Sequence, residues 1–504
     1  MKPRGPVLAG MLMLLPLACT GTVGSTSDAG EGLDAREADG ADGQAADDGT
    51  AGGDRARDAG DAGSDGADGG PDGADAGGDT GSGCATLRVE TVDSASVIPA
   101  PSGPMPAPGV PFVIPETGVS IARISDSVDA GGFASFYTNG YSRFSPANLS
   151  GEYVTAFASN GGAAIYRLAD RAVVATLQVG EPNELHWDSS GAAGTDTHLY
   201  YRTGAQLRRR DVLLGEGSDE LVHDFTAEYP GAGAAINGVE GAPSADMRYW
   251  AFQICDSMDG SGQCRGIRDV IVYDAQADAI AGRLRDRHPS FPTPNFVDMA
   301  PSGSAIVVGT CAGNDPPFNG PYAWTRDFQR PVRLSTNCSH SGWAWSAEGK
   351  QLYVSQDPCG ANNDERTFTC DYIMAVDVDD AEGWEERVPI LYCGDIGWGV
   401  GFHLGRIYFP EVAGWFFIST YTERQGWAAD QLFFVEIEPA DRDPRLFRVA
   451  PTLNSYEGYW SEAFASLDFQ AQHVYWGANW SGQEALQLYQ ATLCTGWWEA
   501  LAGR

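Results

Sequence analysis

Short apolar runs separated by polar turns recur along the chain from about residue 118 to about residue 495. The runs are rich in Tyr, Trp, Phe and Val, and each is followed by a polar loop and a second apolar run. Short runs of this composition, bounded by Gly, Pro, Asp and Ser, are typical of strands in antiparallel sheets. The pattern therefore predicts an all-β fold.

The apolar runs group into seven units, each with a first strand and a partner strand. The first strands are expected at residues 153–157, 199–202, 249–252, 305–308, 352–355, 415–418 and 473–476. The partner strands are expected at residues 164–168, 206–209, 270–273, 322–324, 372–376, 431–435 and 486–489. A repeat of roughly 46 to 64 residues predicts four-stranded antiparallel blades, and hence a seven-bladed β-propeller over residues 118–495. Residues 121–124 are expected to form the outer strand of the last blade and to close the ring.

The N-terminus combines a basic start with a short apolar run. Lys2 and Arg4 precede residues 7–18, and this run is too short to span a bilayer, so it predicts an export signal. Because the run ends in Ala18 and Cys19, it resembles a bacterial lipoprotein signal. That resemblance implies removal of residues 1–18, lipidation of Cys19, and an outer-membrane anchor facing either the periplasm or the cell surface. The alternative is an ordinary secretory signal with an incidental cysteine.

Residues 19–83 form an acidic segment with almost no large apolar side chain. Residues 20–83 hold 16 acids, three arginines and no aromatic residue, within a chain of net charge −36. Such a segment cannot bury enough surface to offset its ordering entropy, so a disordered tether is expected rather than calcium loops, which need regular ligand spacing. Residues 84–117 are expected to be an extended lead-in, and residues 496–504 a C-terminal tail. The negative charge argues against nucleic acid as a partner.

The cysteines suggest disulfides, which export permits. Cys255 and Cys264 flank one polar loop, Cys359 and Cys370 flank another, and each pair is expected to bridge locally. Cys84 and Cys494 stand at the two ends of the folded part, where a bridge would reinforce closure. The pairing of the remaining cysteines is left open by the sequence: Cys311, Cys338 and Cys393.

Polar side chains precede nearly every predicted inner strand and are expected to converge at one mouth of the central channel. They are Arg143, Glu184, His186, Glu240, Asn295, Asp298, His340, His403 and Glu462. Aromatic residues accompany them: Tyr141, Trp187, Trp343, Trp345, Trp398 and Trp460. Such a mouth suits a small polar ligand or a sugar, and we expect Trp343 and the ionisable members of the set to bind it. The alternative is that these groups hydrogen-bond the channel strands and trapped water.

Two family resemblances rest on these residues. The repeated turn-and-strand unit resembles the TolB-type and WD40-like repeats of exported bacterial propellers. The segment from His340 to Lys350 is similar to a blade start of oligogalacturonate lyases, which are seven-bladed propellers. The second resemblance implies that His340 helps to bind manganese, together with a glutamine and two histidines of the next blade. That blade here holds a single histidine, His403, and no nearby glutamine.

Three functions remain open on the sequence. The favoured one is a lipid-anchored scaffold that binds a carbohydrate, another ligand or envelope proteins, without a cofactor. The alternative is a polyuronate lyase in which His340 or His403 is the base and Arg143 stabilises the enolate, with His340 and His403 as weak candidates for a divalent metal. The acidic members of the mouth would repel a polyuronate. The third is a purely structural envelope protein.

Overall fold

The structure is a computed structural model that describes residues 87–502 with short gaps. The gaps are residues 133, 136, 179–183, 239, 260–261, 311–312, 337, 339, 357–370, 397–399, 423–425, 438–442 and 457–458. The predictions for residues 1–83, and those for Cys84, Cys359, Cys370 and Trp398, lie outside the described residues. None of the helices in the described part is long and apolar enough to cross a membrane.

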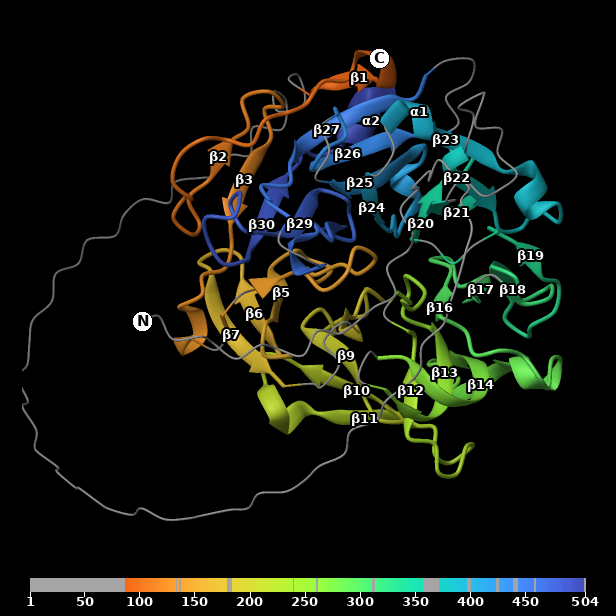
Figure 1. Ribbon diagram of the computed structural model, residues 1–504. Helices are drawn as coiled ribbons and strands as arrows, with labels where there is room; N and C mark the ends of the chain where they lie inside the picture. The colour runs from red at the N-terminus through yellow and green to blue at the C-terminus, as the bar shows by residue number, and fades with distance from the viewer. Residues whose placement is uncertain are drawn as a thin grey trace, which may run out of the picture. The chain divides into compact units, whose positions relative to one another are not determined.

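Seven antiparallel sheets are arranged as blades around a common centre (Figure 1). The inner strands are β4 (Tyr137–Thr138), β8 (His186–Trp187), β12 (Ala234–Ile236), β16 (Phe296–Met299), β20 (Ser341–Trp345), β24 (Gly401–Leu404) and β28 (Ser466–Leu467). The second strands are β5 (Tyr153–Ala158), β9 (His198–Thr203), β13 (Tyr249–Met258), β17 (Ala305–Gly309), β21 (Gln351–Gln356), β25 (Trp415–Tyr421) and β29 (His473–Ala478). The predicted all-β, seven-bladed propeller is confirmed.

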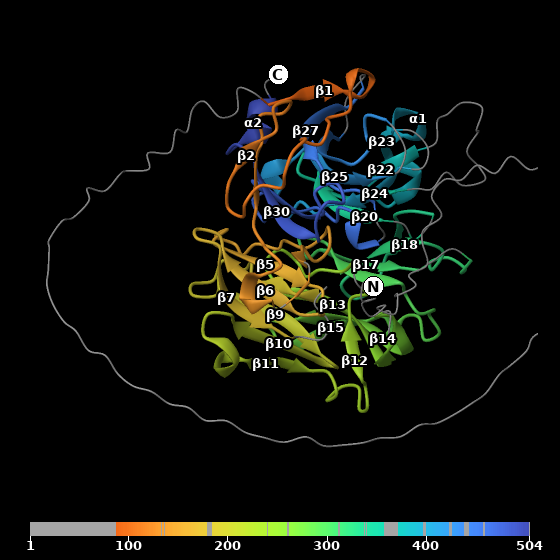
Figure 2. The same ribbon diagram turned by 60° about the vertical axis from the view of Figure 1, so that its left-hand side comes forward.

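The outer half of each blade follows the same order. The third strands are β6 (Ala163–Arg167), β10 (Gln206–Asp211), β14 (Cys264–Asp274), β18 (Pro321–Thr325), β22 (Asp371–Asp377), β26 (Gln431–Glu436) and β30 (Gln487–Thr492). The fourth strands of the first six blades are β7 (Ala172–Leu177), β11 (Glu220–Asp224), β15 (Ala279–Arg283), β19 (Val332–Arg333), β23 (Val388–Tyr392) and β27 (Arg445–Pro451). Figure 2 shows successive blades side by side around the ring, with β5 and β6 beside β9 and β10.

The ring closes through a strand from the start of the folded part. β3 (Ser120–Arg123) pairs with β30, with Ile121 opposite Ala491, so the last blade combines both ends of the fold. In Figure 1 the orange β3 lies beside the blue β30. The pairing covers the outer edge of β30, which would otherwise be a free sheet edge and a site of aggregation. The predicted closing strand at residues 121–124 is thus found, one residue earlier.

The lead-in and the tail belong to the sheets more closely than the sequence suggests. β1 (Val89–Thr91) adds a fifth strand to the sixth blade by pairing with β27, and β2 (Phe112–Val113) adds one to the seventh by pairing with β3. At the other end, α2 (Trp497–Ala502) places the fully buried Trp497 against Phe434 and Phe447, at 4.3 and 5.1 Å between ring centroids. The buried indole explains why this end is a packed helix.

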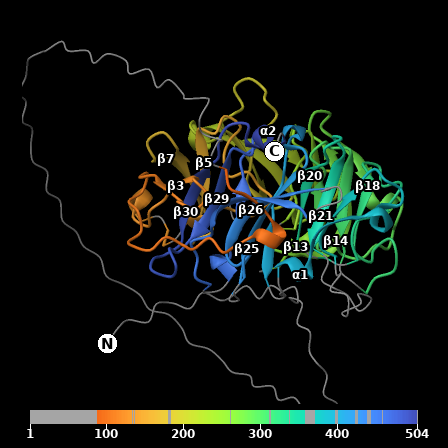
Figure 3. The same cartoon turned by 90° about the horizontal axis from the view of Figure 1, so that it is seen from above.

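Large side chains fill the spaces between blades. The cluster between the fourth and fifth blades, for example, joins Phe296, Trp343 and Tyr353, none more than 1% exposed. In Figure 3 strands of several blades run alongside one another. This arrangement lets the face of each sheet pack against the face of the next. Two of the cysteine predictions concern separate blades: Cys255 and Cys264 form a disulfide across the β13–β14 hairpin of the third blade, and Cys494, just after β30 of the seventh, is also disulfide-bonded.

The connection from β4 to β5 fills the centre of the ring, and we call residues 139–146 the plug. Its side chains reach blades on every side: Tyr141 packs on His403 and Phe464, Phe144 packs on His186, and Arg143 bonds to three further blades. Of the plug residues, only Gly140 is more than marginally exposed. The channel expected from the sequence is therefore occupied by the chain itself.

The Asp298 carboxylate fixes the plug to the blades. Arg143 of the plug donates to Asp298 Oδ2 at 3.5 Å, and Arg406, which follows β24, donates to Oδ1 at 3.0 Å. Trp343 Nε1 and the backbone N–H of Ala242 donate to the same carboxylate at 2.6 and 2.8 Å. Asp298, Arg143 and Arg406 are each at most 1% exposed. Since Glu240 also pairs with Arg143 at 2.8 Å, two cations face two anions.

Asp298→Asn tests the hub. The substitution keeps the volume but leaves two buried guanidinium groups with one carboxylate fewer, and loss of one partner from a buried ionic network typically costs about 3–5 kcal/mol. We expect the urea midpoint of unfolding at pH 7, followed by tryptophan fluorescence, to fall steeply. The matched control is Asp170→Asn, whose pair with Arg167 lies on the surface and which should shift the midpoint little. Equal, small shifts for both variants would contradict this role of Asp298.

Candidate functional site

Beside the plug, four rings from two connections and two strands form a stacked column. His340 precedes β20, His403 lies on β24, Tyr421 ends β25 and Tyr456 follows β27. The centroid distances along the column are 4.7 Å for His340–His403, 5.0 Å for His403–Tyr421 and 6.4 Å for Tyr421–Tyr456, with interplanar angles of 23°, 23° and 12°. The column runs from His340 through the buried His403 to Tyr456, which is 41% exposed.

His403 is paired with Glu462, the residue after the short helical turn Tyr459–Ser461. His403 Nε2 lies 3.0 Å from Glu462 Oε2, and the two residues are 1% and 4% exposed. Burial raises the pKa of Glu462 to about 8, and burial, with a smaller contribution from His340, lowers the pKa of His403 well below 6.5. At neutral pH the pair is therefore an uncharged carboxylic acid and an uncharged imidazole, with the Glu462 O–H donating to Nε2.

The second ring nitrogen of His403, Nδ1, is not used by this pair. It is buried and has no hydrogen-bond partner among the described residues. With Nε2 accepting from Glu462, the tautomer places the proton on Nδ1, which makes this atom an unused donor. His340 is differently engaged, since its Nδ1 bonds to the carbonyl oxygen of Phe402. This bond fixes the orientation of the first ring of the column.

Aromatic side chains surround the His403–Glu462 pair. Tyr459, 36% exposed, packs on Phe464 at 4.8 Å and on Trp460 at 5.3 Å, and Phe464 lies 4.2 Å from His403. Trp460 in turn stacks on Phe157 of β5 at 5.8 Å. The ring column and these residues together are called the aromatic mouth: His340, His403, Tyr421, Tyr456, Tyr459, Trp460, Glu462 and Phe464. It offers apolar ring faces around a small number of polar atoms, as sugar and small-ligand sites do.

The plug supplies the floor of the aromatic mouth. Tyr141 contacts His403 at 5.8 Å between ring centroids, and its hydroxyl donates to Glu240 Oε1 at 3.1 Å. Glu240 is 15% exposed and is held by Arg143 through Oε2. Burial and the neighbouring Glu240 raise the pKa of Tyr141 well above 10, so the phenol remains a donor. Glu240 is thus the charged group nearest to this floor, and it is already paired.

The predicted site residues separate into three groups: those of the aromatic mouth, those of the hub around Asp298, and Glu184 with His186. His340, His403, Glu462 and Glu240 come together at or beneath the aromatic mouth. Asp298, Arg143 and Trp343 form the buried hub instead. Glu184 pairs with Arg202 and accepts from the backbone N–H of Asn237 at 3.3 Å. His186 packs under Phe144, and burial with the nearby Arg406 and Arg202 lowers its pKa to about 3.

Arg143 and the groups around it hold the blades together, as the alternative interpretation of the sequence expects. Arg143 is 1% exposed and bonds to Glu240, Asp298 and Ser341. Burial lowers its pKa, but the carboxylates of Glu240 and Asp298 outweigh that effect and raise it overall. It therefore offers no free cation to a ligand, which corrects its predicted role as an anion-binding group.

Sequence reasoning missed Tyr421, Tyr456, Tyr459 and Arg406. Tyr421 ends the second strand of the sixth blade, and Tyr456 follows its fourth strand. Both therefore lie outside the segments that lead into inner strands, from which the site was predicted. Tyr459 is adjacent to Trp460, which was considered, and the pattern Tyr-Trp-Ser-Glu at 459–462 is the signal that would have found it. Arg406 follows the inner strand that carries His403, on the opposite side from the lead-in.

The described residues of the mouth do not form a set of metal ligands. Imidazole and carboxylate ligands of a transition metal must turn their free lone pairs to one point. Here one nitrogen of each imidazole is engaged, His340 Nδ1 with the Phe402 carbonyl and His403 Nε2 with Glu462, and the two rings stack face to face at 4.7 Å. Across the described part of the chain, no group of three His, Cys, Asp or Glu residues is placed to hold an ion.

No protein-family model matches the chain, and no curated protein matches it. Among solved structures it is similar to an oligogalacturonate lyase from Vibrio parahaemolyticus, at 11% identity and a TM-score of 0.51, over 77% of this chain and 97% of that one. An oligogalacturonate lyase in complex with manganese matches at 12% identity and 0.49, over 77% and 97%. The Cps50 (Swd1) β-propeller domain from Myceliophteria thermophila matches at 12% and 0.40, over 71% and 99%. At these identities the likeness concerns the propeller fold alone.

Proposed function

We propose that the protein is an exported, lipid-anchored propeller that binds a neutral carbohydrate at the aromatic mouth. The observation that carries this proposal is the buried, hydrogen-bonded His403–Glu462 pair, which lies among exposed and half-exposed aromatic rings. Sugar rings place C–H faces on aromatic rings and direct hydroxyl groups to a few fixed donors and acceptors. Tyr459, which is 36% exposed, presents its ring and hydroxyl for such contacts, with Tyr456, 41% exposed, beside the same mouth.

Charge favours a neutral ligand over a polyuronate. Glu240 is a carboxylate at the floor of the mouth, and the two arginines described beneath it, Arg143 and Arg406, are buried and already bonded. A lyase acting on a polyuronate needs cationic groups to pair the substrate carboxylate and to stabilise the enolate. Among the described residues, the lyase alternative, with His340 or His403 as base, therefore lacks the cation that it requires. Docking of a partner protein on the exposed Tyr456 and Tyr459, in place of a sugar, would replace this proposal.

Location completes the proposal. Lipidation is supported by the basic start, with Lys2 and Arg4, and by the apolar run that ends before Cys19. The acidic residues 20–83 would act as a tether between membrane and propeller. A closed ring with few free edges, and with the Cys255–Cys264 disulfide, suits an oxidising compartment outside the cytoplasm. The propeller would then present the aromatic mouth to glycans of the cell envelope or of the surroundings.

Tyr459→Ala tests carbohydrate binding. The change removes a ring face of the aromatic mouth, and we expect affinity for a neutral glycan selected on an array to fall by about tenfold, or ~1.4 kcal/mol, in isothermal titration calorimetry. The matched control is Tyr392→Ala, because Tyr392 is 38% exposed and lies on an outer strand. Absence of binding to every neutral glycan, or equal losses in both variants, would contradict the proposal.

The raised pKa of Glu462 predicts a pH dependence of stability. The unfolded carboxyl ionises near 4.5 and the folded one near 8, so folding takes up a proton between these values, and this group's contribution to stability declines as the pH rises from about 5 to about 8. Glu462→Gln mimics the uncharged acid and removes this decline. Because both proteins keep His403, the difference between their urea midpoints across this range isolates Glu462. A difference that does not vary with pH would show that Glu462 is ionised throughout.

Cys19→Ala tests the anchor. In a Gram-negative host we expect the wild-type chain in the membrane fraction after a high-salt wash, with mass spectrometry showing a lipidated N-terminal Cys19. The Cys19→Ala chain should lose the lipid and leave that fraction, whereas Ser25→Ala, within the tether, should behave as the wild type. A wild-type chain without lipid on Cys19 would support the ordinary secretory signal instead.

A further inference from the structure

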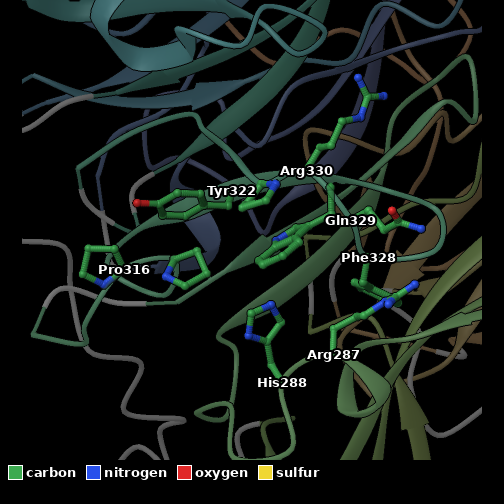
Figure 4. Close-up of a pocket in the computed structure, with 10 residues that line it drawn as sticks. Arg287, His288, Pro316, Tyr322, Phe328, Gln329 and Arg330 are labelled. Carbon is green, nitrogen blue, oxygen red and sulfur yellow. The ribbon is translucent and has the colours of Figure 1, made fainter.

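A cavity of ≈ 570 Å³ opens on the fourth blade and shares no residue with the aromatic mouth (Figure 4). Its walls come from the turn after β15, from β18, from the β18–β19 turn and from the connection that precedes β18. The lining residues are Arg287, His288, Pro316, Pro317, Tyr322, Trp324, Phe328, Gln329, Arg330 and Pro331. We call it the blade-4 cavity.

One wall of the blade-4 cavity is aromatic. Trp324 of β18 stacks on Phe318 at 6.0 Å and 27°, and the imidazole of His288 meets the edges of both at 5.1 and 5.3 Å. In Figure 4 the rings of His288 and Tyr322 point toward the middle of the cavity, with Pro316 beyond Tyr322. Flat rings and prolines around an open volume suit a ligand with a ring of its own, because ring faces pack with little loss of conformational freedom.

Trp324 also carries an unsatisfied donor. The residue is 1% exposed, and its Nε1–H has no hydrogen-bond partner among the described residues. The other fully buried indoles compared here each have an acceptor: Trp187 donates to the carbonyl of Pro146 and Trp476 to that of Thr452. A buried N–H without an acceptor is costly, so this donor at the cavity wall indicates an acceptor that the described residues do not supply.

The charge around the blade-4 cavity is opposite to that of the chain. The net charge of the chain is −36, yet no carboxyl side chain lines the cavity, and Arg287 and Arg330 stand exposed at its rim without an ion pair in the described structure. The neighbouring Asp327 does not line the cavity; it accepts from Thr325 Oγ1 at 2.6 Å and from the Gln329 amide, and Arg287 is near enough to help lower its pKa. Arginines elsewhere are mostly paired, for example Arg248 with Asp274 and Arg445 with Glu436.

We propose that the blade-4 cavity binds a small ring compound that bears a carboxylate. The ring lies against His288, Tyr322 and the prolines, and the carboxylate accepts from Arg287 or Arg330. An oxygen of the ligand accepts from the Trp324 indole N–H. Guanidinium groups form strong, charge-assisted hydrogen bonds with carboxylates, and this gives the site its preference for an anion. An aromatic acid and an acidic sugar share this chemistry.

The test measures binding to the full chain by isothermal titration calorimetry, with benzoate and glucuronate as the two acids and with benzamide and glucose as their neutral counterparts. We expect at least one acid to bind at concentrations up to about 10 mM, and its neutral counterpart to bind at least about tenfold more weakly. Benzoate alone identifies an aromatic acid as the ligand type, and glucuronate alone identifies an acidic sugar.

Three variants locate the site. The double variant Arg287→Gln and Arg330→Gln should weaken binding of the acid by about tenfold or more, and Trp324→Phe, which keeps the packing but removes the N–H, by severalfold. The matched control is Arg285→Gln, an exposed arginine on the same turn that does not line the cavity. Failure of both acids to bind, equal binding of the neutral compounds, or an equal loss in Arg285→Gln would overturn the proposal. Since the arginines are exposed, these outcomes do not depend on the fold tolerating a core change.

Discussion

The contact between the Asp298 carboxylate and two buried guanidinium groups determines how the centre of this propeller is built. Arg143 comes from the first blade and Arg406 from the sixth, while Asp298 belongs to the fourth, so a single carboxylate joins three blades that are far apart in the sequence. Trp343 and the Ala242 backbone satisfy the remaining lone pairs. A network of this kind specifies one arrangement, because each polar group is costly to bury without its partner.

This hub has a direct consequence for the candidate site. Because Arg143 is drawn to the axis, the plug that carries it fills the ring, and its Tyr141 is placed beneath His403. The aromatic mouth is therefore a surface of stacked rings over a closed floor. The same burial that stabilises the floor keeps His403 and Glu462 uncharged, so the chemistry of the mouth follows from the packing below it.

Much of the fold follows from local patterns in the sequence. The strand at 153–157 and its partner at 164–168 are recognisable since apolar and aromatic residues alternate with turn residues, and their register then needs only a short hairpin. The closing strand at 121–124 is predictable because an unpaired apolar run stands before the first unit. By contrast, β1 and α2 cannot be predicted from local patterns, because both depend on contacts with the sixth blade. Glu90 of β1 pairs with Leu446, and Trp497 of α2 packs on Phe447.

The site is less predictable, for a physical reason. The positions of His340, His403 and Glu462 follow from the rule that lead-in residues converge. The rule gives no information on which residues then pair, and Arg143 illustrates this, because its neutralisation depends on Glu240 and Asp298, 97 and 155 residues away. The blade-4 cavity is lined by turns and by β18, and no position that recurs in the sequence repeat predicts it.

Hydrogen–deuterium exchange of residues 139–146 in the purified chain tests the central claim most directly. If the plug is locked by Asp298, its backbone amides should exchange as slowly as those of the inner strands around it, under conditions in which the exposed turn at residues 213–218 exchanges fast. Exchange of the plug at the rate of that turn would mean that the channel is open, and the closed floor described for the aromatic mouth would be wrong.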